Sequence, residues 1–223
     1  MTKSEIIRFL ILRTIGNFLV LFAIFGVIAT FGPSLYYEVQ FRVAKAQGIT
    51  YKVAPPVSQN SNELKTILAK NNERILIPKD TDFSILIPKI GASSLVTPNI
   101  DSDNEDEFIP ALQKGVAHAK GTVFPGMKGN IYLFAHSTDN FWNIGRYNAV
   151  FYLLKDLSFG DEVTIFFENR RHNYVVTDSK IVEAEDVSAL IDSQKINDEN
   201  LILQTCWPPG TTWKRLIVLA KPK

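Results

Sequence analysis

The chain has a single cysteine among its 223 residues, and this scarcity restricts its chemistry. One thiol cannot form an internal disulfide, so Cys206 is either a small buried side chain or a reactive group. The chain also has no excess of charge, because 24 Lys and Arg residues are balanced by 23 Asp and Glu residues. A formal net charge of +1 provides no electrostatic footprint for nucleic acid, and we expect no such partner.

Charged side chains are absent from Thr14 to Tyr37, and residues 15–31 are almost wholly apolar. Twenty-four helical residues reach about 36 Å, enough to cross a hydrocarbon core of roughly 30 Å. The apolar run is long for the hydrophobic region of a signal peptide. We therefore predict a transmembrane helix over residues 14–37 and a cytoplasmic tail over residues 1–13. The short basic tail favours a single-pass protein of the cell membrane with an extracellular domain.

Composition divides the remaining chain into two parts. Residues 38–82 include a stretch rich in Pro, Ser, Asn and Gln, which predicts a stalk or linker with a short helix over Glu63 to Glu73. After it come short runs of β-branched and aromatic residues separated by turn-forming residues. These predicted strands are residues 83–90, 130–136, 162–169, 172–184, 200–206 and 215–221.

The strand spacing predicts an all-β domain over residues 83–223, folded as a closed or nearly closed barrel. Minor helices are predicted in the connections, at Tyr147 to Leu157 and at Val187 to Ser193.

Cys206 ends an apolar predicted strand, and a Trp-Pro-Pro-Gly turn follows it. Arg215 opens the next predicted strand, nine residues later. If the two strands are neighbours, Cys206 and Arg215 lie side by side at one barrel rim. A guanidinium there can stabilise an oxyanion next to a nucleophilic thiol. The alternative is that Arg215 caps a sheet edge or pairs with an acidic residue.

Three histidines are available as a base for the thiol: His118, His136 and His172. His136 follows an apolar predicted strand at its junction with a loop, where catalytic groups are frequently found. His118 lies in a Gly-rich segment, and His172 lies beside two arginines in a predicted hairpin turn. We favour His136, although a histidine at the end of a strand is as typical of a structural role as of a catalytic one.

Several motifs together resemble the sortases, the membrane-anchored cysteine transpeptidases of bacterial surfaces. Residues 202–206, ILQTC, are similar to the family motif T-L-x-T-C, with Ile in place of the first Thr, and a C-x-P-x-G pattern follows. Residues 114–130, KGVAHAKGTVFPGMKGN, resemble the family segment G-x-x-H-x-x-G-T-x-x-P-G. FSILIPKIG at 83–91 resembles the first core strand, and YLFAHST at 132–138 resembles the strand that carries the catalytic histidine. The resemblance covers residues 83–223.

The resemblance implies an eight-stranded β-barrel with His136, Cys206 and Arg215 as catalytic residues. It implies that Cys206 cleaves an LPxTG-like sorting signal of a secreted protein between Thr and Gly, through a thioacyl enzyme. An amine acceptor, either a peptidoglycan precursor or a pilin lysine, then takes the acyl group. Thr205 and Trp207 are predicted to contact the substrate, although simple packing is the alternative for Trp207.

We expect no cofactor and no metal, with a calcium ion at the acidic run of residues 101–107 as the alternative. Some sortases carry an acidic calcium site, but the matching loop here, AHAKGTVFPGMKG, has no acidic residue. The acidic run at residues 101–107 is interpreted as a solvated charged loop.

Two other functions stay open at this point. The first is a cysteine peptidase or hydrolase of unrelated fold, which releases the acyl group to water. The second is a catalytically silent surface binding module in which Cys206 is buried.

Overall fold

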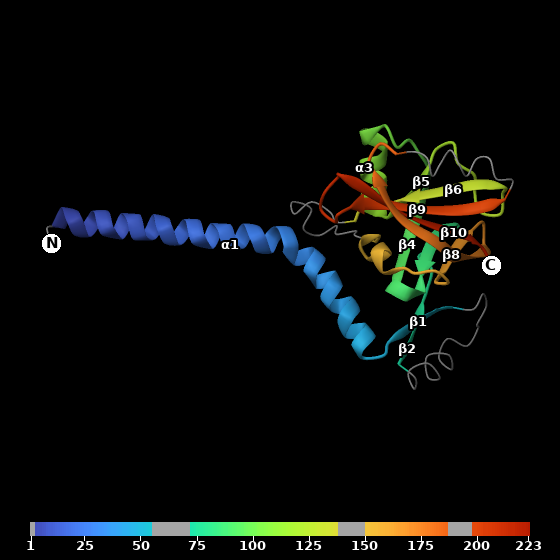
Figure 1. Ribbon diagram of the computed structural model, residues 1–223, viewed down its shortest axis with the longest axis horizontal. Helices are drawn as coiled ribbons and strands as arrows, with labels where there is room; N and C mark the ends of the chain where they lie inside the picture. The colour runs from blue at the N-terminus through green and yellow to red at the C-terminus, as the bar shows by residue number, and fades with distance from the viewer. Residues whose placement is uncertain (1–2, 55–71, 138–149, 187–197) are drawn as a thin grey trace.

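A computed structural model describes residues 3–54, 72–137, 150–186 and 198–223 (Figure 1). The predicted helix at 187–193, most of that at 63–73 and the start of that at 147–157 lie outside the described residues. The described residues form a long N-terminal helix, a small two-stranded sheet and a barrel.

The N-terminal helix α1 runs from Lys3 to Ala46, well beyond both ends of the predicted span. Its portion from Lys3 to Ala29 is long and apolar enough to cross a membrane, with a mean hydropathy of 2.1, and the rest of the chain covers none of it. Figure 1 shows that α1 bends, so that its second half turns beside the barrel. There Glu38 accepts a hydrogen bond from Lys155 of the barrel domain at 2.8 Å.

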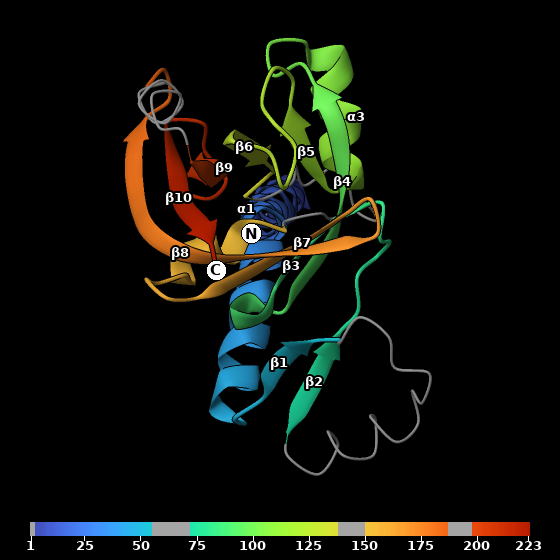
Figure 2. The ribbon, with the colours of Figure 1, turned by 90° about the vertical axis from the view of Figure 1, so that its right-hand side faces the viewer.

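The predicted linker over residues 38–82 is therefore wrong in part. Its first residues continue α1, and two strands follow, β1 (Thr50–Val53) and β2 (Glu73–Leu76), which pair in parallel. These strands lie outside the barrel (Figure 2), and Leu76 packs with Leu86 and Phe166 of the barrel wall. The flanks differ from the Pro- and Asn-rich stretch because they carry apolar side chains that pack on the barrel, with Leu76 buried and Tyr51 and Val53 partly buried.

Eight strands among the described residues close into a barrel, which confirms the predicted fold class. Their order around the barrel is β10-β8-β7-β3-β4-β5-β6-β9, and β10 pairs with β9 to complete it. The strands are β3 (Phe83–Ile87), β4 (Ala92–Ile100), β5 (Val116–Ala119), β6 (Gly129–Phe134), β7 (Glu162–Phe167), β8 (Arg170–Glu183), β9 (Glu199–Trp207) and β10 (Lys214–Pro222).

In the described part of the chain, three short helices join the strands: η1 (Pro88–Ile90), α3 (Glu105–Lys114) and η2 (Tyr152–Asp156). The structure corrects the interpretation of the acidic run, most of whose acids form the first turn of α3. Asn104 caps this helix, since its side chain accepts a hydrogen bond from the Asp106 N–H at 3.1 Å. Asn104 followed three residues later by Glu107 is the sequence signal of such a cap.

The strands that end at the rim present one buried face and one partly open face. Leu203 of β9 and Val218 of β10 are directly paired and fully buried. Gln204 and Cys206 belong to the other face, because side chains alternate along a strand, and both are half-buried. Because Leu203 and Val218 are buried in the core, the alternation along the strands directs Gln204 and Cys206 to the partly open face.

Candidate active site

Cys206 lies one residue before the end of β9 and is half-buried. In the barrel β9 lies between β6 and β10. Groups from two different strands can therefore flank this thiol.

Arg215 flanks Cys206 from β10. The antiparallel register pairs the two residues directly, so their side chains project from the same face with Cα atoms about 4.5–5.5 Å apart. The sequence expectation that they lie side by side at one rim is met. In this structure Nη1 of Arg215 donates to the carbonyl oxygens of Thr212 at 2.9 Å and Lys214 at 3.1 Å. Those bonds use two of the five guanidinium donors, and within the described parts of the chain Arg215 has no carboxylate partner.

His136 flanks Cys206 from the opposite side. Strands β6 and β9 are parallel, and their last paired residues are Phe134 and Gln204. The contact continues beyond the strand end, since the Ala135 N–H donates to the Gln204 carbonyl at 3.2 Å. Two residues further along this register, His136 is level with Cys206, and it is half-buried. The topology thus brings a histidine, a cysteine and an arginine from three adjacent strands to one rim.

Thr205 is buried, with only 3% of its surface exposed. Its hydroxyl donates to the Ala135 carbonyl at 2.9 Å, directly before His136. Since Thr205 points to the opposite face from Cys206, this geometry favours a role in joining the two strand ends over the predicted substrate contact. Trp207 ends β9, is half-buried and packs against the hydrophobic core, which is the packing role weighed as its alternative.

The other two histidines lie on strands that do not neighbour β9. His118 on β5 is fully buried, and its Nε2 donates to the Val123 carbonyl at 3.0 Å while its Nδ1 accepts from the Asn99 N–H at 3.3 Å. Burial lowers the pKa of His118, so its neutral form is favoured. Its ring also stacks on Phe124, with centroids 4.6 Å apart. His118 is therefore a structural residue, and His172 pairs with Ile165 in the β7-β8 hairpin.

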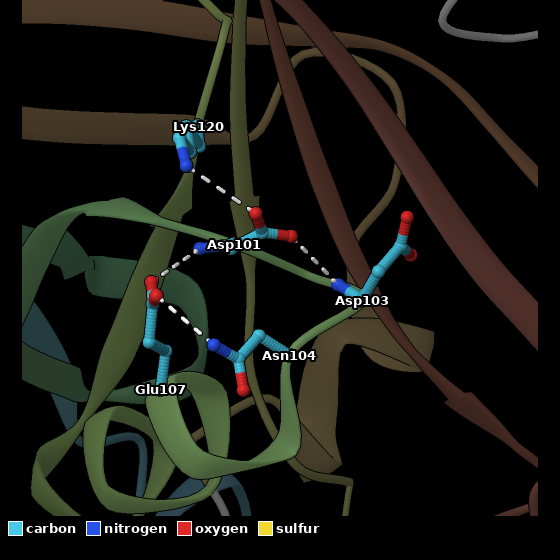
Figure 3. Close-up of polar contacts among 5 residues, drawn as sticks. All are labelled: Asp101, Asp103, Asn104, Glu107 and Lys120. Atoms are coloured by element: carbon cyan, nitrogen blue, oxygen red, sulfur yellow. Dashed lines mark hydrogen bonds and ion pairs between the residues drawn. The ribbon is translucent and has the colours of Figure 1, made fainter.

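The acidic cluster at the start of α3, formed by Asp101, Asp103 and Glu107, is held by internal contacts (Figure 3). Asp101 accepts hydrogen bonds from Lys120 at 3.4 Å and from the Asp103 N–H at 3.1 Å, and Glu107 accepts from the Asn104 amide at 3.1 Å. The Asp103 N–H, followed by the Lys120 ammonium, lowers the pKa of Asp101. Among the described residues, no group of three or more His, Cys, Asp or Glu side chains is arranged to hold a metal ion.

Sequence reasoning did not find two polar residues on the face that carries Cys206. Tyr132 of β6 donates a hydrogen bond through Oη to Oε1 of Gln204 on β9. The only available signal was their spacing, because Tyr132 precedes His136 by four residues and Gln204 precedes Cys206 by two. Residues separated by an even number of positions along a strand point to the same face, so Tyr132 shares a face with His136 and Gln204 shares a face with Cys206.

A family model described as "Sortase domain" matches residues 85–223, well over half of the chain. The chain belongs to the sortase family. The sortase family is a family of cysteine transpeptidases.

One curated relative and two solved structures illustrate the similarity. Sortase D of Bacillus subtilis (strain 168) is 30% identical over 113 residues, which are 49% of this chain and 51% of the relative. The match therefore spans about half the length of that sortase.

Two solved structures share the fold. The Sortase D5 transpeptidase of Clostridium perfringens has a TM-score of 0.50 at 23% identity, over 74% of this chain and 90% of its own. A lid mutant of Sortase A from Corynebacterium diphtheriae has a TM-score of 0.53 at 22% identity, over 85% of this chain and 93% of its own.

Proposed function

We propose that this sortase is a membrane-anchored transpeptidase that cleaves an LPxTG-like sorting signal between Thr and Gly and transfers the acyl group to an amine. The observation that supports this proposal is the strand register, which sets His136 and Arg215 on either side of Cys206. A nucleophile, a proton carrier and an oxyanion donor are the three groups that acyl transfer requires.

In the first half-reaction the Cys206 thiolate attacks the threonine carbonyl carbon and forms a C–S bond. The carbonyl oxygen becomes an oxyanion, and Arg215 donors turned from the Thr212 and Lys214 carbonyls stabilise it. The imidazolium of His136 donates its proton to the glycine nitrogen, and the C–N bond breaks. The products are a thioester on Cys206 and a free glycine amine.

In the second half-reaction an acceptor amine attacks the thioester carbon, and neutral His136 takes the amine proton. The C–S bond breaks, the Cys206 thiolate leaves, and a new amide joins the secreted protein to its acceptor. The proposed acceptor is a peptidoglycan precursor or a pilin lysine. The apolar part of α1, Lys3–Ala29, is the proposed single-pass anchor in the cell membrane, with the barrel outside the cell.

The test uses the full chain in detergent with a fluorogenic LPxTG peptide, with and without an amine acceptor. Cys206→Ala and His136→Ala should each abolish cleavage, and Arg215→Ala should lower kcat/KM by about 10²–10³-fold, as removal of an oxyanion donor does. His172→Ala is the matched control and should keep wild-type activity, because His172 lies on a strand that does not neighbour β9. Mass spectrometry should find the acyl group on Cys206.

A fully active His136→Ala enzyme would overturn the assignment of the base. Products separate transfer from hydrolysis, because a transpeptidase yields the amine adduct whereas a peptidase yields only the free acid.

A further inference from the structure

The hydrogen bond between Tyr132 and Gln204 joins β6 to β9 on the face that carries Cys206. Gln204 precedes Cys206 by two residues, which is about 6.6 Å along a strand. Gln204 is half-buried, whereas Tyr132 is only 7% exposed. The polar pair of Tyr132 and Gln204 therefore lies beside the proposed nucleophile, with Gln204 as the preceding residue on the same face of β9.

The surroundings of this pair are mostly apolar. Ile202 and Phe134 lie on the same face of β9 and β6, and Ile217 of β10 pairs directly with Gln204. All three apolar side chains are buried. A polar group in such surroundings is oriented by its few partners, because an unpaired one is costly.

The orientation of the Gln204 amide follows from the state of Tyr132. Burial raises the pKa of Tyr132, and the positive charge of Arg215 offsets part of that rise, so the phenol is protonated at neutral pH and donates. The Tyr132 hydroxyl donates to Oε1 of Gln204, which leaves the amide nitrogen of Gln204 on the side away from that hydroxyl. This nitrogen donates no hydrogen bond to any residue in the described parts of the chain.

We propose that Gln204 is a substrate-binding residue whose amide N–H donates to a backbone carbonyl of the sorting signal, and that Tyr132 is the positioning residue that orients it. The proposal rests on the proposed function. In an LPxTG-like signal the four residues Leu-Pro-x-Thr lie on the acyl side of the cleaved bond. In the proposed binding mode the acyl side of the signal runs extended along β9 toward Gln204. An extended peptide advances about 3.4 Å per residue, so in this mode the contact about 6.6 Å from the thiol is two residues from the scissile carbonyl, at the proline carbonyl.

The test compares two peptides on the full chain in detergent: the LPxTG amide, and a depsipeptide in which the Pro–x amide is an ester. An ester carbonyl is a weaker hydrogen-bond acceptor than an amide carbonyl. We expect the wild-type enzyme to lose about tenfold in kcat/KM on the ester, the value of one hydrogen bond. Gln204→Leu should lose about tenfold on the amide and show no further loss on the ester.

Tyr132→Phe removes only the hydroxyl and should reduce the discrimination between amide and ester to about threefold. Tyr174→Phe is the matched control, since Tyr174 is 1% exposed and donates to Glu199 at 2.5 Å, near the far end of β9. It should lower the melting temperature about as much as Tyr132→Phe and leave the amide-to-ester ratio at the wild-type value.

Equal amide-to-ester ratios in the wild type and Gln204→Leu would overturn the proposal while cleavage of the amide peptide still supports the proposed function. A change in this ratio for Tyr174→Phe as large as that for Tyr132→Phe would also overturn it, because the effect would then be one of stability. Absence of Cys206-dependent cleavage in the wild type would overturn the proposed function first. Equal rates of the wild-type enzyme on the amide and the ester would overturn the proposal even if Gln204→Leu fails to fold.

Discussion

Replacing Thr205 with Val tests whether the two strand ends of the site are held together by one buried hydroxyl. Thr205 donates to the Ala135 carbonyl at 2.9 Å, and this carbonyl belongs to the residue before His136. Both residues are buried, with exposed fractions of 3% and 5%. Valine keeps the approximate shape of the side chain but leaves the carbonyl without that donor.

The stability lost in Thr205→Val follows from the burial of the Ala135 carbonyl. A buried acceptor that loses its partner costs about 1–3 kcal/mol of unfolding free energy. In a protein of this size that loss lowers the melting temperature by roughly 2–12 °C. The rate should change more, because a displacement of about 1 Å between catalytic groups can cost roughly 10²-fold. We expect kcat to fall by about 10–100-fold and KM to change little.

The assay is peptide cleavage by the full chain, together with thermal unfolding of the same samples. Thr205→Ser restores the hydroxyl and should recover most of kcat. Thr177→Val is the matched control, since its hydroxyl donates to the Leu219 carbonyl at 3.2 Å between β8 and β10. The reasoning is refuted if Thr205→Val loses stability but keeps the wild-type kcat, or if Thr177→Val lowers kcat equally.

Two further predictions concern stability. Burial lowers the pKa of His118 in the folded protein, so below pH 6.5 the unfolded chain gains a proton that the folded chain does not. The contribution of His118 to the free energy of unfolding is complete above pH 6.5. It falls as the pH decreases below 6.5, by at most about 1.4 kcal/mol per pH unit. Urea unfolding should show a flatter pH dependence for His118→Gln, and parallel curves would contradict this. Lys155→Ala removes the 2.8 Å ion pair with Glu38, so amide hydrogen exchange should quicken in the last turns of α1, with up to about 1 kcal/mol lost. The charge-swapped double variant Glu38→Lys, Lys155→Glu should restore the protection of these amides against hydrogen exchange. An unchanged rate of hydrogen exchange in Lys155→Ala would show that the ion pair does not dock α1.

The sequence predicted those strands whose signal is local. The runs that became β3, β6, β7, β8, β9 and β10 are rich in β-branched and aromatic residues and are bounded by turns. In contrast, β4 includes two serines and Pro98, and β5 has only four residues, so neither has a strong pattern of its own. Both strands form because neighbouring strands supply hydrogen bonds and a buried face.

The individual candidates for the site were also readable from the sequence. One cysteine before a Pro-Gly turn, one histidine after an apolar strand and one arginine at the start of the last strand are local features. Their motifs, taken with their order along the chain, were sufficient to indicate the sortase family.

Only the tertiary structure decided which of these residues lie together. His136 and Cys206 are 70 residues apart, and they become level because β6 and β9 pair in parallel with that offset. The same pairing directs the Thr205 hydroxyl to Ala135 and joins Gln204 to Tyr132. Periodicity along a strand tells which residues share a face, but it carries no information on which strand lies beside it. That choice depends on closing the whole barrel around one core, and so the chemical environment of Cys206 was determined by the fold.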